Sequence, residues 1–278
     1  MKKIGICFPE KDFIKTPSED FKKDLTKLRE SGLYSFDLYT KFLLTYKPTN
    51  HLLDLFNDLN IKITFHYHGV TYNNNLKRTI NLYKKEISEL RKILDKNNHK
   101  YQTSIVFHVP DYQNDKYSHT KKMIVLFKEI SDYAQTYNFN ILVETLSHNH
   151  TTGQHIGDDF SELKLFSNYI KNDNFGICWD LGHTRLNQIE QKNNLLLTND
   201  LIKRTKHTHI HNFGFKKDQC FDHIPLTNLK MQDDELNLLI DNNYQGIYNL
   251  EFEMERLKEN IDIYCENIKL LSNYIKER

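Results

Sequence analysis

The chain has 278 residues, of which 38% are hydrophobic and 12% aromatic, enough for the core of one large domain. Its 38 basic and 37 acidic residues leave a formal charge of +1, so no net field draws it to nucleic acid or to an anionic membrane. The four cysteines are scattered with no close pair, which suggests neither a disulfide framework nor a cysteine zinc site. No apolar run approaches membrane-spanning length, and the N-terminal apolar stretch is too short for a secretory signal, so we expect a cytoplasmic protein.

Short apolar runs alternate with helical patterns from one end of the chain to the other. Parallel strands that are buried on both faces have this near-continuous apolar character. The pattern predicts strands over residues 4–8 and 35–39, four runs that end at His66, His108, Glu144 and Asp180, a run that ends at residues 209–211, and a strand over residues 246–251.

A helical pattern follows each of these runs. Residues 16–19 are typical of a capping box with Pro17 at the first helical position, and Gly32 ends the helix that follows. Further helices are predicted through residues 52–59, 76–94, 123–133 and 160–170, the last opened by Asp158 and Asp159, and then over roughly residues 194–203, after Asp233 and through 257–271. Eight alternations predict a single α/β domain over residues 1–278, a (β/α)8 TIM barrel.

Four of the predicted strands end in a side chain that binds metals, namely Glu144, Asp180, His209 and Glu251. In a closed α/β barrel the carboxyl ends of all strands meet at one mouth. Either glutamate alone is equally typical of a solvated strand end, but carboxylates seldom lie within apolar strands unless they are paired or bind a metal. The mixed oxygen and nitrogen set suits a divalent zinc, manganese or magnesium ion, and the histidine content favours zinc or manganese.

Asp180 is followed by His183 three residues later, so both side chains can reach one ion or its bound substrate across the turn into the next helix. Gly182 allows that turn to be tight. His223 falls in a predicted loop after the seventh strand, from which it can close the site from above.

The remaining histidines alternate along strands. His207, His209 and His211 share one strand face, with His209 at the expected depth, and His68 competes with His66 on another. Candidates for a second ion or for contacts with substrate are therefore His66, His68, His108, His183, His211 and His223.

In this order and spacing, the residues resemble the xylose isomerase-like TIM-barrel superfamily, which contains sugar isomerases, sugar epimerases and endonuclease IV. The resemblance covers nearly the full length and is carried by Lys3-Ile4-Gly5-Ile6, residues 31–38, Trp179-Asp180-Leu181-Gly182-His183, His209-Ile210-His211, residues 223–226 and Leu250-Glu251. For the epimerase branch the resemblance implies one divalent metal held by Glu144, Asp180, His209 and Glu251. It also implies that the two glutamates act as acid and base and that His183 contacts substrate.

Endonuclease IV holds three zinc ions in a larger ligand set, which this chain matches at His66, His108, Glu144, Asp180, His183, His209, His223 and Glu251. One departure is that the endonuclease carries Asp-x-His where this chain has Phe221-Asp222-His223, which puts the third zinc in doubt. The DNA-penetrating loop sequences of the endonuclease are not recognised here, and the near-neutral charge does not favour binding of a phosphate backbone. The sugar branch is therefore preferred.

The resulting hypothesis is a metal-dependent isomerase or epimerase of a sugar, sugar phosphate or polyol. The ion polarises a carbonyl and its neighbouring hydroxyl while Glu144 and Glu251 exchange a proton with the carbon between them; a hydride shift is the alternative chemistry. Two other classes are an endonuclease IV-type phosphodiesterase with a multinuclear site and a barrel that binds ligand without catalysis. The expected partner is a small carbohydrate, with no membrane, nucleic acid disfavoured and a homo-oligomer left open.

Overall fold

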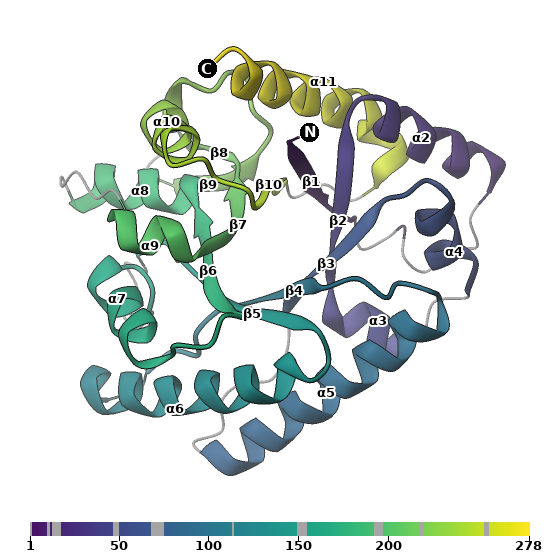
Figure 1. Ribbon diagram of the computed structural model, residues 1–278. Helices are drawn as coiled ribbons and strands as arrows, with labels where there is room; N and C mark the ends of the chain where they lie inside the picture. Colours follow the sequence, from purple (N-terminus) through teal and green to yellow (C-terminus); the bar gives the residue numbers. More distant parts are fainter. Residues whose placement is uncertain are drawn as a thin grey trace.

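Eight parallel strands close into a barrel in the computed structural model, which describes residues 2–9, 12, 18–46, 50–67, 75–112, 114–148, 155–191, 197–216, 219–252 and 256–278. The strands follow one another around the barrel in chain order, and the last pairs with the first (Figure 1). They are β1 Lys3–Cys7, β2 Leu33–Tyr39, β3 Lys62–Tyr67, β4 Thr103–Phe107, β5 Phe139–Glu144, β6 Phe175–Asp180, β7 Thr205–Ile210 and β10 Ile247–Leu250. The predicted TIM barrel is confirmed.

Helices form a ring outside the barrel (Figure 1). They are α2 Glu19–Glu30, α3 Thr40–Tyr46, α4 Asn50–Asp58, α5 Leu76–Lys96, α6 Lys116–Gln135, α7 Phe160–Tyr169, α8 Leu181–Gln191, α9 Asn199–Arg204, the 3-10 helix η1 Lys230–Gln232, α10 Asp233–Asp241 and α11 Leu257–Lys276. The sequence did not predict α3, which is only seven residues long, or α8, which begins directly at the end of β6. None of the described helices combines the length and the apolar character needed to span a bilayer.

Polar residues at the helix ends explain where several helices begin and stop. The predicted capping box is wrong, because Ser18 is the N-cap of α2 and accepts a hydrogen bond from the backbone N–H of Phe21 at 3.2 Å. Residues 13–17 lie outside the described part of the chain. Gly32 has φ +110° just beyond α2, where a side chain would be strained, which agrees with its predicted role. Asp159 caps α7 through the N–H of Ser161 at 2.8 Å, as predicted.

The barrel interior is built in layers, because residues two apart on a strand face the same side. Below the strand-end residues Glu144, Asp180, His209 and Glu251 lies a buried middle layer that includes Leu142, Cys178, His207 and Asn249. Only Val106, Leu142 and Cys178 form an apolar cluster there, whereas the main hydrophobic core lies between strands and helices. The inside of the barrel is therefore mostly polar.

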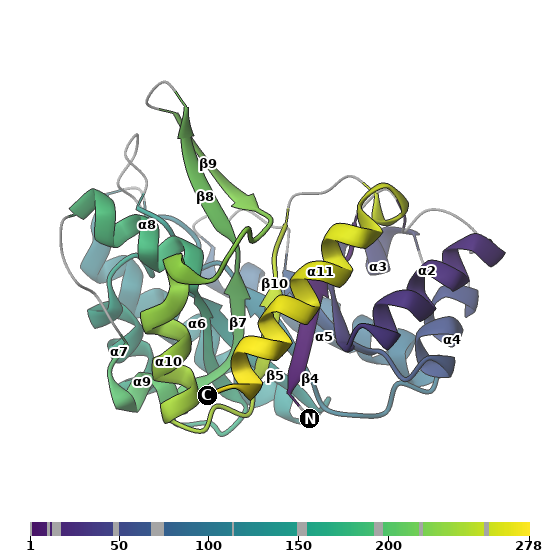
Figure 2. The same ribbon diagram turned by 90° about the horizontal axis from the view of Figure 1, so that it is seen from above.

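An antiparallel hairpin, β8 Asn212–Lys216 and β9 Gln219–Ile224, follows β7 and stands apart from the barrel sheet. Figure 2 shows it projecting beyond the end of the barrel that lies opposite the two termini. The sequence predicted a loop here. Strands this short, which pair only with each other in the described structure, do not produce a clear strand pattern in the sequence. The prediction that His223 lies in a loop is wrong: His223 lies on β9, and its backbone adopts φ +52°.

Candidate metal centre

The four strand-end residues of the predicted metal set gather at the carboxyl end of the barrel. Nδ1 of His209 lies 2.9 Å from Oε1 of Glu144, 3.0 Å from Oε2 of Glu251 and 4.0 Å from Oδ2 of Asp180. One potential ligand atom from each of the four lies within 4.8 Å of all the others, and all four residues are buried. Their place at one point is therefore a structural fact, while their role as ligands stays a prediction.

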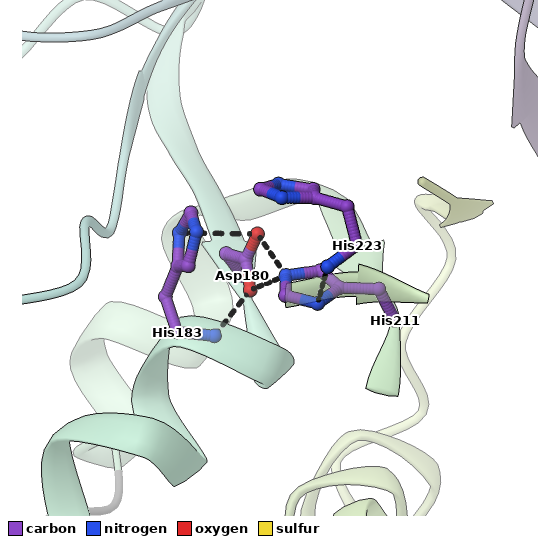
Figure 3. A group of neighbouring side chains, drawn as sticks. All are labelled: Asp180, His183, His211 and His223. Carbon is purple, nitrogen blue, oxygen red and sulfur yellow. Dashed lines mark hydrogen bonds and ion pairs between the residues drawn. The ribbon is translucent and has the colours of Figure 1, made fainter. Parts of the chain in front are cut away.

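A second cluster shares Asp180 and adds three of the candidate histidines, His183, His211 and His223 (Figure 3). Nδ1 of His183 lies 3.2 Å from Oδ2 of Asp180, and Nε2 of His211 lies 3.2 Å from each of its oxygens. The rings of His211 and His223 are stacked with centroids 4.2 Å apart. One carboxylate thus faces one imidazole from α8 and one from His211, the residue between β7 and β8, while His223 comes from the hairpin.

A third cluster shares Glu144 and joins it to His66 and His108. Nε2 of His108 lies 3.1 Å from Oε2 of Glu144 and 3.1 Å from Nε2 of His66, which is itself 3.5 Å from the same oxygen. His66 is buried, whereas the side chain of His108 is half exposed. Because Glu144 and Asp180 each belong to two clusters, the three clusters form one continuous group of possible ligands.

The donor set fits a divalent cation. Oε2 of Glu144 and Oε2 of Glu251 are buried and form no hydrogen bond within the described chain, although imidazole nitrogens lie within 3.5 Å of both. Buried polar atoms are normally hydrogen-bonded, because leaving one unpaired costs about 1–3 kcal/mol. A bound ion would satisfy these two buried oxygens.

Electrostatics at the centre favour a positive charge. Burial by itself raises the pKa of Glu144, but His209, His108 and His66 outweigh it and hold the pKa well below its ordinary value. Burial by itself lowers the pKa of His209, yet surrounding anionic groups that include Glu144 and Glu251 raise it well above its ordinary value. A proton on His209 and a metal ion therefore compete for the same negative surroundings.

Asp37 is a residue near the centre that the sequence analysis missed. Asp37 on β2 is buried and places Oδ2 3.4 Å from Nε2 of His209, on the side of the ring away from the carboxylates of the cluster. Its Oδ1 accepts a hydrogen bond from Thr64 at 2.9 Å. A carboxylate behind a histidine fixes the orientation of the ring and increases its basicity as a ligand. The signal was present, because an aspartate inside an otherwise apolar strand is as uncommon as Glu144.

Gly182 has a different role from the predicted one. Asp180 is followed directly by α8, and its Oδ1 accepts the N–H of His183 at 2.7 Å, so no separate turn intervenes. A Cβ atom on Gly182 would lie 2.3 Å from Cε1 of His211. The glycine is needed because the ring of His211 packs closely against it. This contact could not be predicted from the sequence, because the two residues are 29 positions apart.

The other candidate residues have mixed outcomes. Asp222, whose displaced position raised doubt, lies 3.1 Å from Nδ1 of His223 and 4.0 Å from Nε2 of His183, so its carboxylate still reaches the second cluster. His211, one of the three alternating histidines 207, 209 and 211, belongs to the second cluster. His68 lies outside the described residues.

The fold and the site together define a (β/α)8 barrel that collects carboxylates and imidazoles, a candidate metal centre, at its carboxyl end. The model of the xylose isomerase-like TIM barrel family matches residues 25–274. This chain therefore belongs to the xylose isomerase-like TIM barrel family. The comparison with curated proteins gives no match.

Solved structures of similar fold include several enzymes. A D-psicose 3-epimerase from Clostridium cellulolyticum H10 superposes with a TM-score of 0.67 at 14% identity, covering 99% of this chain and 98% of that one. The probable 3-DHS dehydratase AsbF from Bacillus anthracis gives 0.66 at 15% identity, with 98% and 99% covered. An L-ribulose 3-epimerase gives 0.64 at 11% identity, with 99% and 94% covered. At these identities the likeness concerns the fold.

Proposed function

We propose that this protein is a divalent-metal-dependent isomerase or epimerase of a sugar. The observation that carries the proposal is the pair of buried glutamates, Glu144 and Glu251, which approach His209 to 2.9 and 3.0 Å from strands separated by β6 and β7. Two carboxylates beside one cation site are what a proton exchange at a carbon next to a carbonyl requires. Similar folds among ketose 3-epimerases make a ketose the first substrate to test.

Glu144, Asp180, His209 and Glu251 would hold the ion. When bound, zinc or manganese would polarise the carbonyl and adjacent hydroxyl of the sugar. Glu144 and Glu251 each keep a buried Oε2 that forms no hydrogen bond to the described residues, so each has an oxygen that can take or return a proton. Asp37 fixes the ring of His209 from behind, and the buried position of all these groups limits access of competing water.

His183 would orient the substrate. Its Nδ1 faces Asp180 and its ring lies 5.2 Å from that of His211, centroid to centroid. Burial lowers the pKa of His183, so its imidazole is held neutral and can donate or accept one hydrogen bond with a substrate oxygen. The neutral form avoids placing a further positive charge beside the ion.

The test compares Glu144→Gln and Glu251→Gln with a surface control, Glu129→Gln on α6. Each change at the centre should lower turnover of ketoses about 10²- to 10⁴-fold, the usual worth of a general acid or base, and the control should be fully active. In D2O the active protein should place solvent deuterium in its product. Turnover without deuterium uptake would indicate a hydride shift, and full activity in both variants would refute the role of the glutamates.

A second candidate function is a phosphodiesterase of the endonuclease IV type. It is favoured by the three linked clusters, because Glu144 and Asp180 each belong to two of them and each would serve more than one ion if several were bound. This function requires about three metal ions per chain and cleavage of abasic-site DNA. Metal analysis of the purified protein separates the two functions, since one ion supports the isomerase. A barrel that only binds its ligand would turn over neither substrate class.

A further inference from the structure

The opposite end of the barrel contains a cavity of about 490 Å³ that takes no part in the proposed reaction. It is lined by the first residues of the strands, including Lys62, Ser104, Asn140, Thr205 and Ile247. Lys62, Ser104, Asn140 and Ile247 each lie four residues before a mouth residue. Their side chains therefore face the barrel interior two layers below the candidate metal centre. The separation is about 13 Å at 3.3 Å per residue.

Four lysines line this cavity, Lys3, Lys62, Lys203 and Lys206, and its described lining contains no Asp or Glu. The ammonium groups have neutral partners. Lys3 donates to the carbonyl of Gln245 at 3.0 Å, Lys206 donates to the carbonyl of Asp173, and Nζ of Lys62 lies 4.6 Å from the ring centroid of Tyr101. These neutral partners use part of the hydrogen-bonding capacity of the lysine ammonium groups. Their positive charges are not balanced by a carboxylate in the described lining of the cavity.

A backbone irregularity aims one of the lysines inward. On β6, Ile177 pairs with Thr205 and the next residue, Cys178, pairs with His207, so Lys206 is an extra residue in β7. Such a bulge redirects a side chain and is common beside functional sites. Gly176 makes room for it, because a Cβ atom there would lie 3.2 Å from Cδ of Lys206.

The position of Lys206 is unfavourable for a cation in the unliganded protein. Burial lowers its pKa, and Arg204 lowers it further, more than the nearby Asp173 raises it. A protein that only needed a sealed barrel base would place an apolar side chain at this bulge. Several uncompensated ammonium groups around a roomy cavity are the arrangement expected for an anionic ligand.

We infer that the cavity at the amino end of the barrel is a binding site for a small phosphorylated molecule, held by Lys3, Lys62 and Lys206. Phosphate offers several acceptor oxygens and up to two charges to these three point charges. The volume lies within the range of small-molecule sites and leaves space for an organic group beside Tyr101 and Tyr244. This inference does not depend on the proposed sugar chemistry.

Calorimetric titration with ribose 5-phosphate, inorganic phosphate and ribose tests the site. Both phosphates should bind and ribose should not, with ribose 5-phosphate tighter and its affinity falling as salt is raised. Lys62→Gln and Lys206→Gln should each weaken binding at least 10-fold. Lys22→Gln, an exposed lysine of α2, and Glu144→Gln at the mouth should leave it unchanged.

Lys62→Gln is the safer variant, because the contact of Lys62 is with the ring of Tyr101, whereas Lys206 donates to a backbone carbonyl. The Tm of each variant shows whether it folds. No binding of either phosphate, or binding that neither Lys62→Gln nor Lys206→Gln weakens, would overturn the inference. Binding lost in Glu144→Gln but kept in the lysine variants would place the phosphate at the mouth and overturn it as well.

Discussion

The two ends of this barrel carry different kinds of ionisable group. At the carboxyl end, carboxylates and imidazoles crowd within 4.8 Å of one another, whereas the amino end presents four lysines around an open cavity. Three of these lysines, Lys3, Lys62 and Lys206, come from strands β1, β3 and β7, and Lys203 comes from α9. One scaffold can therefore offer a cation site and an anion site about 13 Å apart without either charge cancelling the other.

The largest expected effect is that of Asp180→Asn, which should weaken metal binding at the carboxyl end and leave phosphate binding at the amino end unchanged. Asp180 is common to the four-residue centre and to the cluster with His183, His211 and His223, so one change weakens both. We expect metal affinity to fall more than about 100-fold, because removing a ligand should cost more than removing a residue that only hydrogen-bonds to a ligand. Metal content after dialysis measures this, with Asp241→Asn on α10 as the surface control. Phosphate binding at the other end should not change; retention of the metal would show that Asp180 is not a ligand.

Asp37→Asn should have the next largest effect. The amide keeps the shape but removes the charge behind Nε2 of His209, so metal affinity should fall about 10- to 100-fold. Thr64→Val, which removes only the hydroxyl that orients Asp37, should cost less. Competition with a coloured chelator measures both affinities. A purely structural role for Asp37 predicts instead a lower Tm of the metal-free protein at unchanged affinity.

The carboxyl end of the barrel could be predicted from the sequence to a greater extent than the amino end. Strand ends and their polar residues follow a period of two, so the barrel and the place of Glu144, Asp180, His209 and Glu251 could be derived from local patterns. The hairpin β8–β9 and the bulge at Lys206 could not, because each depends on which strand a segment pairs with. Lys62 and Lys206 resemble ordinary surface lysines in the sequence, since nothing local shows that the barrel curls around them.

Gly182→Ala tests the packing behind the second cluster. Alanine favours a helix over glycine by up to about 1 kcal/mol, but the new Cβ would meet the ring of His211 at 2.3 Å. Overpacking usually costs about 1–3 kcal/mol, so we expect a net loss of stability, measured by urea unfolding. Gly214→Ala on the hairpin is the matched control, because its Cβ would meet only Ile224 at 4.0 Å. A stabilised Gly182→Ala protein would show that His211 moves freely.

The smallest effect is expected at the amino end, on lowering the pH. His99 is buried, with Nε2 3.0 Å from the carbonyl of Leu53 and Nδ1 3.1 Å from the hydroxyl of Tyr101. The neutral ring donates from Nε2 and accepts at Nδ1 from Tyr101, whose oxygen in turn accepts the N–H of Ile63 at 2.7 Å. A second proton, on Nδ1 of His99, would point at the hydroxyl oxygen of Tyr101. The hydroxyl could then no longer donate to Nδ1.

Burial lowers the pKa of His99, followed by smaller effects of Lys62 and Arg91, while the hydrogen bond to Leu53 opposes them. Above pH ~6.5 neither the folded nor the unfolded ring is charged, so His99 adds no pH dependence there. Below it the unfolded chain takes up a proton that the folded chain resists, so stability should be lost as the pH falls. The Tm of wild type should therefore drop more than that of His99→Gln between pH 7.5 and about 5. Equal drops would show that the loss of stability arises away from His99 and not beside the cavity at the amino end.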